Sequence, residues 1–314
     1  MAMKNVKNAS PVKKNTGKIA YWQIDYKIKS ILKTESAVVL PSPEAWKKIK
    51  WSRSYFEKKP ESGYFIWIKK QPDTPLRTCI SIANKNIHQK LQNLLIVEKN
   101  LNVDVQGLCN VLAKNCQAKH QATGKIILRA GSTLTYDHTH LWDKKDIIEP
   151  SYNFILEKNS KLNYTYKNLL PPKILNINTT INLSDRAKAN LKILADCIDT
   201  TINITDTLIL KGKESSGIVY LRIVGKKNSQ INSRSRIIAE AAGKGHLDCQ
   251  GLLISQDSEI KLSPEIIVKN KNAAVTHEAA VGKISEKELN YLRTRGLSET
   301  EAINLIVAGF LVEI

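Results

Sequence analysis

The feature that most constrains the fold is a repeat in the middle of the chain. The segments LLIVEKNLNVDVQG, KIILRAGSTLTYDH and NFILEKNSKLNYTY share one pattern: an apolar run, a short turn containing Lys, Gly or Asn, and then alternating residues. Ile96, Ile127 and Ile155 occupy the same place in it, so the period is 31 and then 28 residues. Periods of this length indicate stacked structural units.

The same succession of short β-branched runs and polar turns continues to about residue 284. Apart from PPKILNINTTINLSDRAKANLK at 171–192, nothing between 94 and 284 has a helical period, so the crossover helices of a doubly wound sheet are missing. In a β-solenoid, each coil buries its inward residues against the coils above and below. We therefore predict a mainly β fold with a β-solenoid core over 91–284.

The two ends of the chain differ from this core. Residues 1–18 are basic and poor in apolar side chains, which predicts a disordered tail. Residues 19–90 mix the helical candidates IDYKIKSILK and PSPEAWKKIKW with the strand-like GYFIWIKK, which indicates a mixed α/β region. Residues 285–314 are predicted to be helical.

Two helix starts are marked in the C-terminal region. Ser285 with Glu288 and Ser298 with Glu301 form S-x-x-E pairs, in which a hydroxyl and a carboxylate satisfy free backbone amides. Gly296 falls where the first helix should end. The second helix, AINLIVAGFLVEI, is apolar on nearly all sides. We expect these helices to cap the open end of the solenoid, and the second to bury against the solenoid or against another subunit.

The charge and cysteine content limit the partners and the compartment. The 48 Lys and Arg against 29 Asp and Glu give a net charge of +19, which suits an acidic partner, nucleic acid or a solvated basic surface. The five cysteines are irregularly spaced, with no CxxC pair and no secretory signal, which points to a cytoplasmic protein. No apolar run approaches the roughly 18 residues of a membrane-spanning helix, so no membrane association is expected.

A possible ligand set lies near the end of the core. His277 and Glu278 are neighbours, so on a strand their side chains point to opposite faces unless a bulge intervenes. Cys249 precedes His277 by 28 residues, one repeat, which would place the two on stacked strands about 5 Å apart. A thiolate and an imidazole at that distance suit a soft metal. The alternative is an inert core cysteine and a polar residue at the edge of the solenoid.

The segments NSRSRIIAEAAGKGHLDCQGLLISQ and PEIIVKNKNAAVTHEAAVGKISEKELNYLRTRGLSETEAINLIVAGFL carry further motifs: Cys-x-x-Leu-Leu-Ile, His-Glu-Ala, Tyr-Leu-x-x-Arg-Gly and Gly-Phe. They resemble the C-terminal half of the SufB and SufD family, scaffold components of iron-sulfur cluster assembly. NCQAKHQATGKIILRAGSTLTYDHTHLW is similar to a second family segment, so the resemblance covers residues 90–314. It implies a right-handed parallel β-helix with helical regions, most like the compact archaeal SufB-like scaffolds.

The resemblance also implies roles for particular residues. Cys249 and Glu278 match the SufB cysteine and glutamate implicated in cluster assembly, and His277 aligns with the histidine implicated in SufD. SufD-type chains generally lack this cysteine, so the chain is more similar to SufB. One difference is that no cysteine lies between Cys116 and Cys197, where bacterial SufB has a further one.

The function implied by the resemblance is that of an assembly scaffold, not an enzyme, building a transient iron-sulfur cluster for apo acceptor proteins. One Cys, one His and one Glu make half a site, which predicts a homodimer through the β-helix. The C-terminal helices would dock a SufC-like ABC-type ATPase, with Arg293, Arg295 and Glu301 exposed to it. Because the chain has no GxxxxGK[ST] motif, ATP hydrolysis is expected in that partner.

Other interpretations of the sequence stay open. A second possible set of metal ligands is Cys109, Cys116, His120, His138 and His140. Their spacing is not that of a standard zinc site, and the resemblance favours Cys116 and His120. Cys79 and Cys197 are expected in the core. A rival function is a basic structural β-solenoid that binds nucleic acid or self-assembles without metal, although aromatic residues are too few for a stacking surface. A third is a family member that docks the ATPase but assembles nothing.

Overall fold

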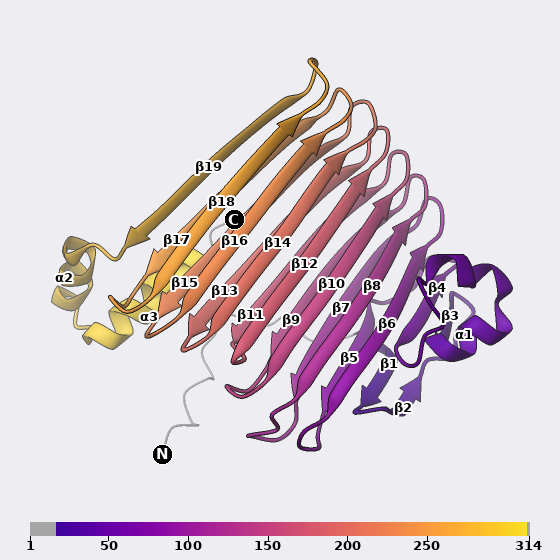
Figure 1. The fold of residues 1–314 in the computed structure, drawn as a ribbon, viewed down its shortest axis with the longest axis horizontal. Coiled ribbons are helices and arrows are strands. Elements are labelled where there is room, and N and C mark those ends of the chain that lie inside the picture. The colour runs from indigo at the N-terminus through magenta and orange to yellow at the C-terminus, as the bar shows by residue number, and fades with distance from the viewer. Residues whose placement is uncertain (1–16, 313–314) are drawn as a thin grey trace.

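The computed structural model describes residues 17–312, and nearly all of the predicted tail lies outside them. The described chain winds into a β-helix whose strands alternate between two sheets (Figure 1). Within residues 17–312, one sheet has ten strands in the order β19-β17-β15-β13-β11-β9-β7-β5-β1-β2, and the other has nine in the order β18-β16-β14-β12-β10-β8-β6-β4-β3. The predicted solenoid is confirmed.

The strands of the ten-stranded sheet, sheet A, are β1 (Lys18–Ile24), β2 (Lys27–Ile31), β5 (Leu76–Ile82), β7 (Asn102–Val111), β9 (Thr133–Leu141), β11 (Lys161–Leu170), β13 (Lys188–Ile198), β15 (Ser216–Lys226), β17 (Lys244–Leu253) and β19 (Ala274–Lys283). Those of the nine-stranded sheet, sheet B, are β3 (Ala37–Pro41), β4 (Tyr64–Ile68), β6 (His88–Val97), β8 (Lys119–Leu128), β10 (Ile147–Leu156), β12 (Ile174–Leu183), β14 (Thr201–Leu210), β16 (Gln230–Ala239) and β18 (Glu259–Val268). The helices are α1 (Ser42–Lys48), the 3-10 helix η1 (Lys50–Tyr55), α2 (Glu286–Thr294) and α3 (Glu299–Val312).

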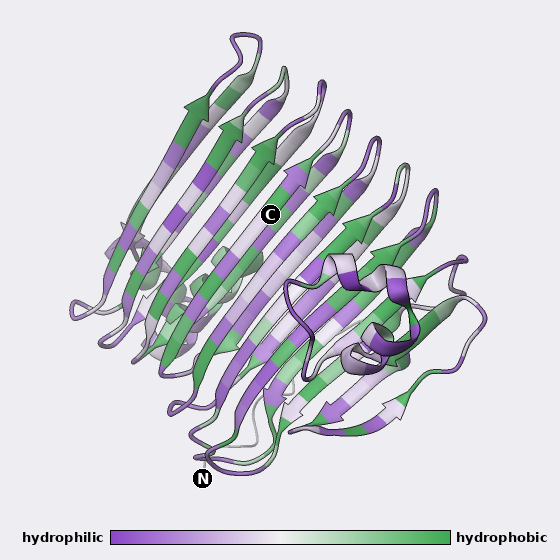
Figure 2. Cartoon of the chain, turned by 45° about the vertical axis from the view of Figure 1, so that its right-hand side comes forward, coloured by the Kyte–Doolittle hydropathy of each residue, from purple (hydrophilic) through white to green (hydrophobic). Residues whose placement is uncertain are grey.

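The register of the parallel ladders follows the sequence repeat. Ile96 on β6 pairs with Ile127 on β8, which pairs with Ile155 on β10. Successive side chains of a strand point to opposite sides, and hydrophobic and hydrophilic bands alternate along many of the strands in Figure 2. In β14, for example, the even-numbered residues are buried while the odd-numbered ones are exposed or half-buried. The core is therefore a column of inward side chains running the length of the solenoid.

One turn adopts a left-handed backbone in several successive coils. Asn100, Gly131 and Asn159 have φ of 59°, 73° and 60° at corresponding positions of successive turns. Asparagine and glycine adopt this conformation more readily than other residues. At Gly131 the space is limited as well, because an added Cβ would lie 2.2 Å from Oδ1 of Asn100. The Gly and Asn turns of the repeat thus have a conformational reason.

Local sequence gave the wrong structure in two places. IDYKIKSILK, a predicted helix, belongs to the β1–β2 hairpin, with Asp25 at φ 53° in the turn. The helical period at 171–192 is also overridden, since these residues belong to β12 and β13. β2 pairs with β1, which in turn pairs with β5, whereas β12 lies between β10 and β14, so tertiary pairing overrides the local pattern. PSPEAWKKIKW does form α1 and η1, and GYFIWIKK contains β4.

The C-terminal helices begin at the predicted serines, and α3 buries against the solenoid as expected, although not at its open end. Ser285 caps α2 by accepting from the N–H of Lys287, not through the predicted pair with Glu288. Ser298 and Glu301 form a reciprocal capping box, and Gly296, with φ 91°, follows the end of α2. α3 does not cover the open end of the solenoid. Its Val307 and Leu311 pack on the outer face of sheet A, in a cluster with Leu194, Val224 and Leu252. No helix within residues 17–312 is long and apolar enough to cross a membrane.

The C-terminal end of the solenoid is left open as a result. β18 pairs only with β16 and β19 only with β17 among the described strands, so each presents one unpaired edge. Ile267, Val268 and Val281 in these two strands are each 40–49% exposed. Natural proteins usually shield such edges, because an unpaired strand can add a strand of another chain.

Candidate functional site

Cys249 lies in the lumen one coil below the open end. It belongs to the inward-facing residues of β17 and is 1% exposed. Burial raises the pKa of its thiol to about 12, opposed by a hydrogen bond with Ser235. The thiol is therefore protonated and shielded from solvent in this conformation.

A buried carboxylate lies close to this thiol. Asp206 on β14 is fully buried, and its Oδ1 accepts a hydrogen bond of 3.1 Å from the hydroxyl of Ser235. Its Oδ2 has no hydrogen-bond partner among the described residues. Burial raises the pKa of Asp206 to about 7, with the Ser235 hydrogen bond acting in the other direction. Ser235 interacts with both groups, so Asp206 lies near the Cys249 thiol, and its negative charge also raises the pKa of that thiol.

The ladder between β17 and β19 fixes the relation of the predicted ligands. Cys249 pairs with Ala279, whereas His277 pairs with Leu247, 277 − 247 = 30 residues earlier. The 28-residue spacing therefore does not place His277 on Cys249, because the last coil is two residues longer. Glu278 pairs with Asp248 and belongs to the opposite face of sheet A. His277 and Glu278 do point to opposite faces, as the strand geometry predicts.

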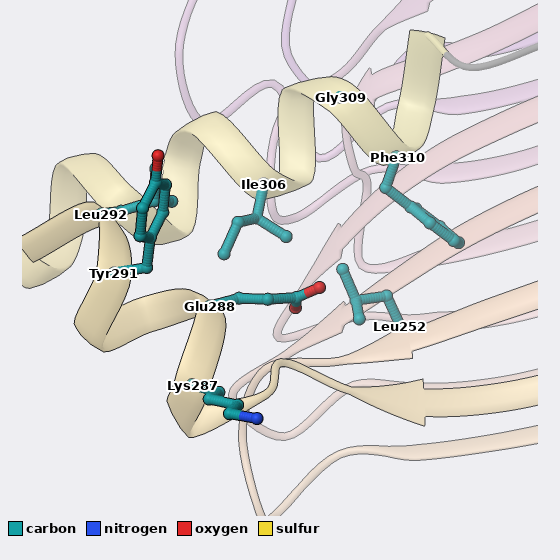
Figure 3. Close-up of a pocket in the computed structure, with 8 residues that line it drawn as sticks. All are labelled: Leu252, Lys287, Glu288, Tyr291, Leu292, Ile306, Gly309 and Phe310. Carbon is teal, nitrogen blue, oxygen red and sulfur yellow. The ribbon is translucent and has the colours of Figure 1, made fainter.

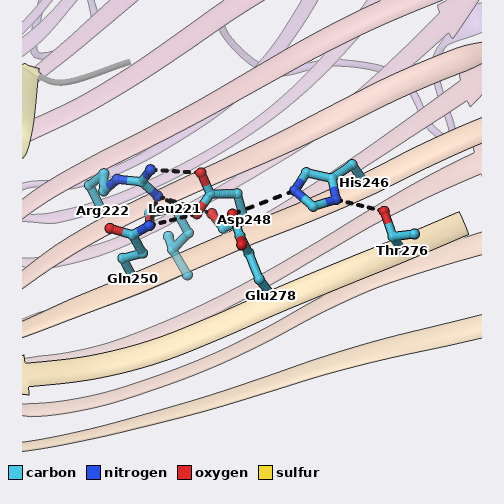
Figure 4. Close-up of polar contacts among 7 residues, drawn as sticks. All are labelled: Leu221, Arg222, His246, Asp248, Gln250, Thr276 and Glu278. Carbon is cyan, nitrogen blue, oxygen red and sulfur yellow. Dashed lines mark hydrogen bonds and ion pairs between the residues drawn. The ribbon is translucent and has the colours of Figure 1, made fainter.

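On the outer face, Glu278 lies near two groups of polar contacts (Figure 4). Arg222 and Asp248, both under 10% exposed, form a bidentate ion pair with distances of 2.9 and 2.7 Å. The amide of Gln250 donates to the Asp248 carboxylate at 3.2 Å. Nε2 of His246 lies 3.8 Å from the Glu278 carboxylate. Glu278 therefore lies beside His246 and Asp248 of the preceding strand, on the face of sheet A opposite to Cys249.

Both His277 and Glu278 are exposed on β19. The structure thus separates the three predicted ligands into a buried thiol inside the lumen and two accessible side chains on the terminal strand. Joining them at one ion within a single chain requires a change in β19 or a contribution from a second chain.

The second predicted ligand set is rearranged by the fold. Cys109, His138 and His140 are all buried, with their ligand atoms within 4.8 Å of one another. Cys116, expected to pair with His120, instead has its sulfur 3.1 Å from the carbonyl of Ala113. His120 contacts Gln89 instead: Nδ1 of His120 lies 2.7 Å from Oε1 of Gln89. Of the cysteines predicted in the core, Cys197 is fully buried and Cys79 is half-buried.

The pairing of Cys109 with His140 could have been predicted from the repeat in the sequence. The two residues are 140 − 109 = 31 positions apart, the first period of the repeat, and they pair in register between β7 and β9. Extending the alignment of Ile96 with Ile127 by thirteen residues reaches this pair. The motif spacing tested in the sequence, Cys109 to Cys116 to His120, follows the chain and crosses a turn instead.

The C-terminal helices form a groove against sheet A (Figure 3). Its volume is about 750 Å³, and its lining is mainly apolar: Leu252, Lys287, Glu288, Tyr291, Leu292, Ile306, Gly309 and Phe310. Arg293, Arg295 and Glu301 are exposed on the helices that form the groove. The guanidinium of Arg295 lies 5.3 Å from the ring centre of Tyr291, and the Glu301 carboxylate is occupied by the Ser298 cap.

Comparison with known proteins gives a consistent result. Residues 80–310 match the family model described as SUF system FeS cluster assembly, SufBD core domain. An iron-sulfur cluster assembly SufBD family protein of Methanothermobacter thermautotrophicus (strain Winter) is 32% identical over 256 residues, covering 79% of this chain and 62% of that protein. One from Archaeoglobus fulgidus is 26% identical over 298 residues, covering 88% and 79%. The chain spans about three fifths of the Methanothermobacter relative.

Proposed function

The chain belongs to the SufBD family of the SUF system for iron-sulfur cluster assembly, and on this premise we propose that it is a scaffold on which a nascent cluster is built at a subunit interface. Cys249, His277 and Glu278 are the proposed ligands. The cluster is cargo that the scaffold releases, and the scaffold carries out no chemical turnover of its own. The observation that carries the proposal is the position of Cys249, one coil inside an open end whose terminal strand bears the other two residues.

The proposed ligand set suits temporary binding. Thiolates are the preferred ligands of iron-sulfur clusters, and histidine nitrogen replaces them in some clusters. A single buried cysteine with one imidazole and one carboxylate supplies too few thiolates to retain a cluster permanently. A second copy meeting the first across a two-fold axis doubles the set. The proposed unit is therefore a homodimer.

The open end offers a surface for that dimer. The free edges of β18 and β19 carry unpaired backbone groups, and their exposed apolar side chains Ile267, Val268 and Val281 lie on the same coil. Pairing of strand edges between two copies would bury these groups and bring His277 and Glu278 to the interface. Because the Cys249 thiol is shielded, a movement of β19 is needed to expose it.

The partner that supplies this movement is proposed to be a SufC-like ABC-type ATPase bound to the C-terminal helices. The apolar groove beside α2 and α3 is a surface on which a partner side chain or helix can pack. α3 is fixed to sheet A through Val307 and Leu311, which pack on β13, β15 and β17, and β17 pairs with β19. A displacement of these helices would therefore act on the coil that holds Cys249.

Replacing Cys249 by serine is expected to abolish cluster formation. The chain, co-expressed with its ATPase and reconstituted anaerobically with iron and sulfide, should develop thiolate-to-iron absorption, and Cys249→Ser should lose it because the proposed thiolate is gone. The measurement is visible absorption together with iron and sulfide content. Cys197→Ser is the matched control, since Cys197 is equally buried but lies on β13.

Two results would contradict the scaffold assignment. If wild-type protein stays colourless, or if Cys249→Ser takes up iron and sulfide equally while remaining folded, Cys249 is not a ligand. A steep loss of DNA binding with increasing salt in the same preparations would then favour the basic structural solenoid.

Reversing charge on α2 is expected to weaken binding of the ATPase. Arg293→Glu combined with Arg295→Glu should reduce affinity at least about tenfold, equivalent to about 1.4 kcal/mol, because both guanidinium groups are exposed beside the groove. Isothermal titration against a SufC-type ATPase measures this. Lys90→Glu with Lys161→Glu makes the same change in charge at two exposed positions of the solenoid. Equal loss in both double variants would indicate a nonspecific charge effect and contradict docking at α2.

A further inference from the structure

A second group of potential ligands lies deep in the lumen, away from the terminal coil. The sulfur of Cys109 lies 3.4 Å from Nε2 of His138, and Nε2 of His140 lies 3.2 Å from the same atom. All three side chains are at most 6% exposed. Cys109 on β7 and Cys249 on β17 are separated by five ladder steps of sheet A, about 24 Å, so this group is distinct from the proposed cluster site.

The surroundings orient both imidazoles toward one point. Nδ1 of His140 lies 2.8 Å from the hydroxyl of Tyr166, and Nδ1 of His138 lies 3.4 Å from that of Tyr164. With each Nδ1 engaged, Nε2 of His138 faces both the Cys109 thiol and Nε2 of His140. Metal-binding histidines in proteins are commonly held in this way by a partner on the second nitrogen.

Space for the His138 ring is built into the neighbouring strand. Gly107 on β7 pairs with His138, and a Cβ at Gly107 would lie 2.7 Å from the imidazole. Beside the ring is a cavity of about 10 Å³, room for about one water-sized body. Its lining includes Cys109, His138 and His120. Nε2 of His120 has no hydrogen-bond partner among the described residues, although the ring is fully buried.

Two of the three ligand separations are close to the edges of a metal tetrahedron, and the third, between the ligand atoms of Cys109 and His140, is within 4.8 Å. Nitrogen and sulfur ligands around tetrahedral zinc are separated from one another by about 3.3 Å for N to N and about 3.6 Å for S to N. The observed separations are 3.2 and 3.4 Å.

We propose that Cys109, His138 and His140 bind one divalent ion of the zinc or ferrous type, with a fourth position open to the cavity beside His120. Thiolate and imidazole together select ions of this class over magnesium or calcium. The ion would join β7 to β9 and stabilise this part of the lumen. The alternative is a chain of hydrogen bonds in which His140 donates to His138, and it predicts no metal at all.

The test uses the full chain in a Cys249→Ser background, so that metal at the proposed cluster site does not contribute. Elemental analysis of protein purified without chelators identifies a native ion as zinc or iron. Titration of the metal-free protein with Co²⁺ should give about one equivalent bound. The spectrum should show ligand-field bands of a four-coordinate ion, held by three protein ligands and one water, and a thiolate-to-cobalt charge-transfer band. Adding Cys109→Ser should remove the charge-transfer band, and His140→Gln should weaken cobalt binding. Cys197→Ser is the matched buried control.

A folded Cys249→Ser protein that binds no Co²⁺ overturns the proposal in favour of the hydrogen-bonded cluster. Cobalt spectra unchanged by Cys109→Ser and by His140→Gln overturn it as well, because the ion then lies elsewhere. Near-ultraviolet circular dichroism confirms folding, and His140→Gln provides an independent assay if Cys109→Ser does not fold. Failure of cluster formation at Cys249 leaves this result unaffected.

Discussion

Replacing Asp248 by alanine is expected to lower the free energy of unfolding by about 3–5 kcal/mol, because it leaves the buried charge of Arg222 without its partner. Arg222 is 6% exposed, and its guanidinium donates to both carboxylate oxygens of Asp248. Its remaining hydrogen bonds, to the carbonyls of Leu221 and Asp248, do not neutralise the charge. Urea unfolding at constant m-value measures the loss.

Two further variants separate the ion pair from a simple loss of packing. Arg222→Met with Asp248→Leu removes both charges and should recover most of the lost stability. Glu265→Ala, which breaks the pairs with Arg234 and Arg236 on the opposite sheet, should cost under about 1 kcal/mol per pair because these groups are more exposed. An effect of Asp248→Ala no larger than that of Glu265→Ala would contradict the argument.

Replacing Asp206 by asparagine is expected to stabilise the protein at pH 8 and to change its stability little below pH 4. Burial raises the pKa of Asp206 to about 7, while the unfolded chain has the ordinary value of 3.8. Between these values the folded state holds a proton that the unfolded state has lost, so stability falls as pH rises through this window. The difference between the two pKa values corresponds to about 4 kcal/mol above pH 7.

The measurement is the free energy of unfolding of wild type and Asp206→Asn at pH 5 and pH 8. The variant should lose most of the decline between the two, because the amide is neutral throughout and can still accept from Ser235. Asp137→Asn, on the exposed face of β9, should change stability by less than about 0.5 kcal/mol at either pH. An unchanged pH profile in Asp206→Asn would show that the carboxylate is solvated in solution.

The sequence was sufficient for the solenoid because its repeat is local. Ile96, Ile127 and Ile155 mark one place in successive coils, and the ladder pairs them as the repeat requires. The capping box of Ser298 with Glu301 was equally visible, since it depends on residues three positions apart. Features set by neighbours in the chain or by a regular period need no tertiary information.

The site depended on information that the repeat does not contain. The coil from Leu247 to His277 is two residues longer than the period of 28, so the register, and with it the neighbour of Cys249, came only from the structure. The same holds for Asp206, whose proximity to the Cys249 thiol arises from the facing of two sheets. Turn length alters register by whole residues, and each single-residue slip moves a side chain to the other face.

The sequence by itself therefore determined the stacked β architecture, the helix starts and the similarity to SufB and SufD. Only the tertiary structure decided that α3 lies on sheet A and leaves the last coil open, that Cys249 and Glu278 are on opposite faces, and that Cys109, His138 and His140 converge in the lumen. The physical reason is that strand periodicity fixes which side of a strand a residue occupies, whereas contacts across the lumen and between coils depend on the register of the whole ladder.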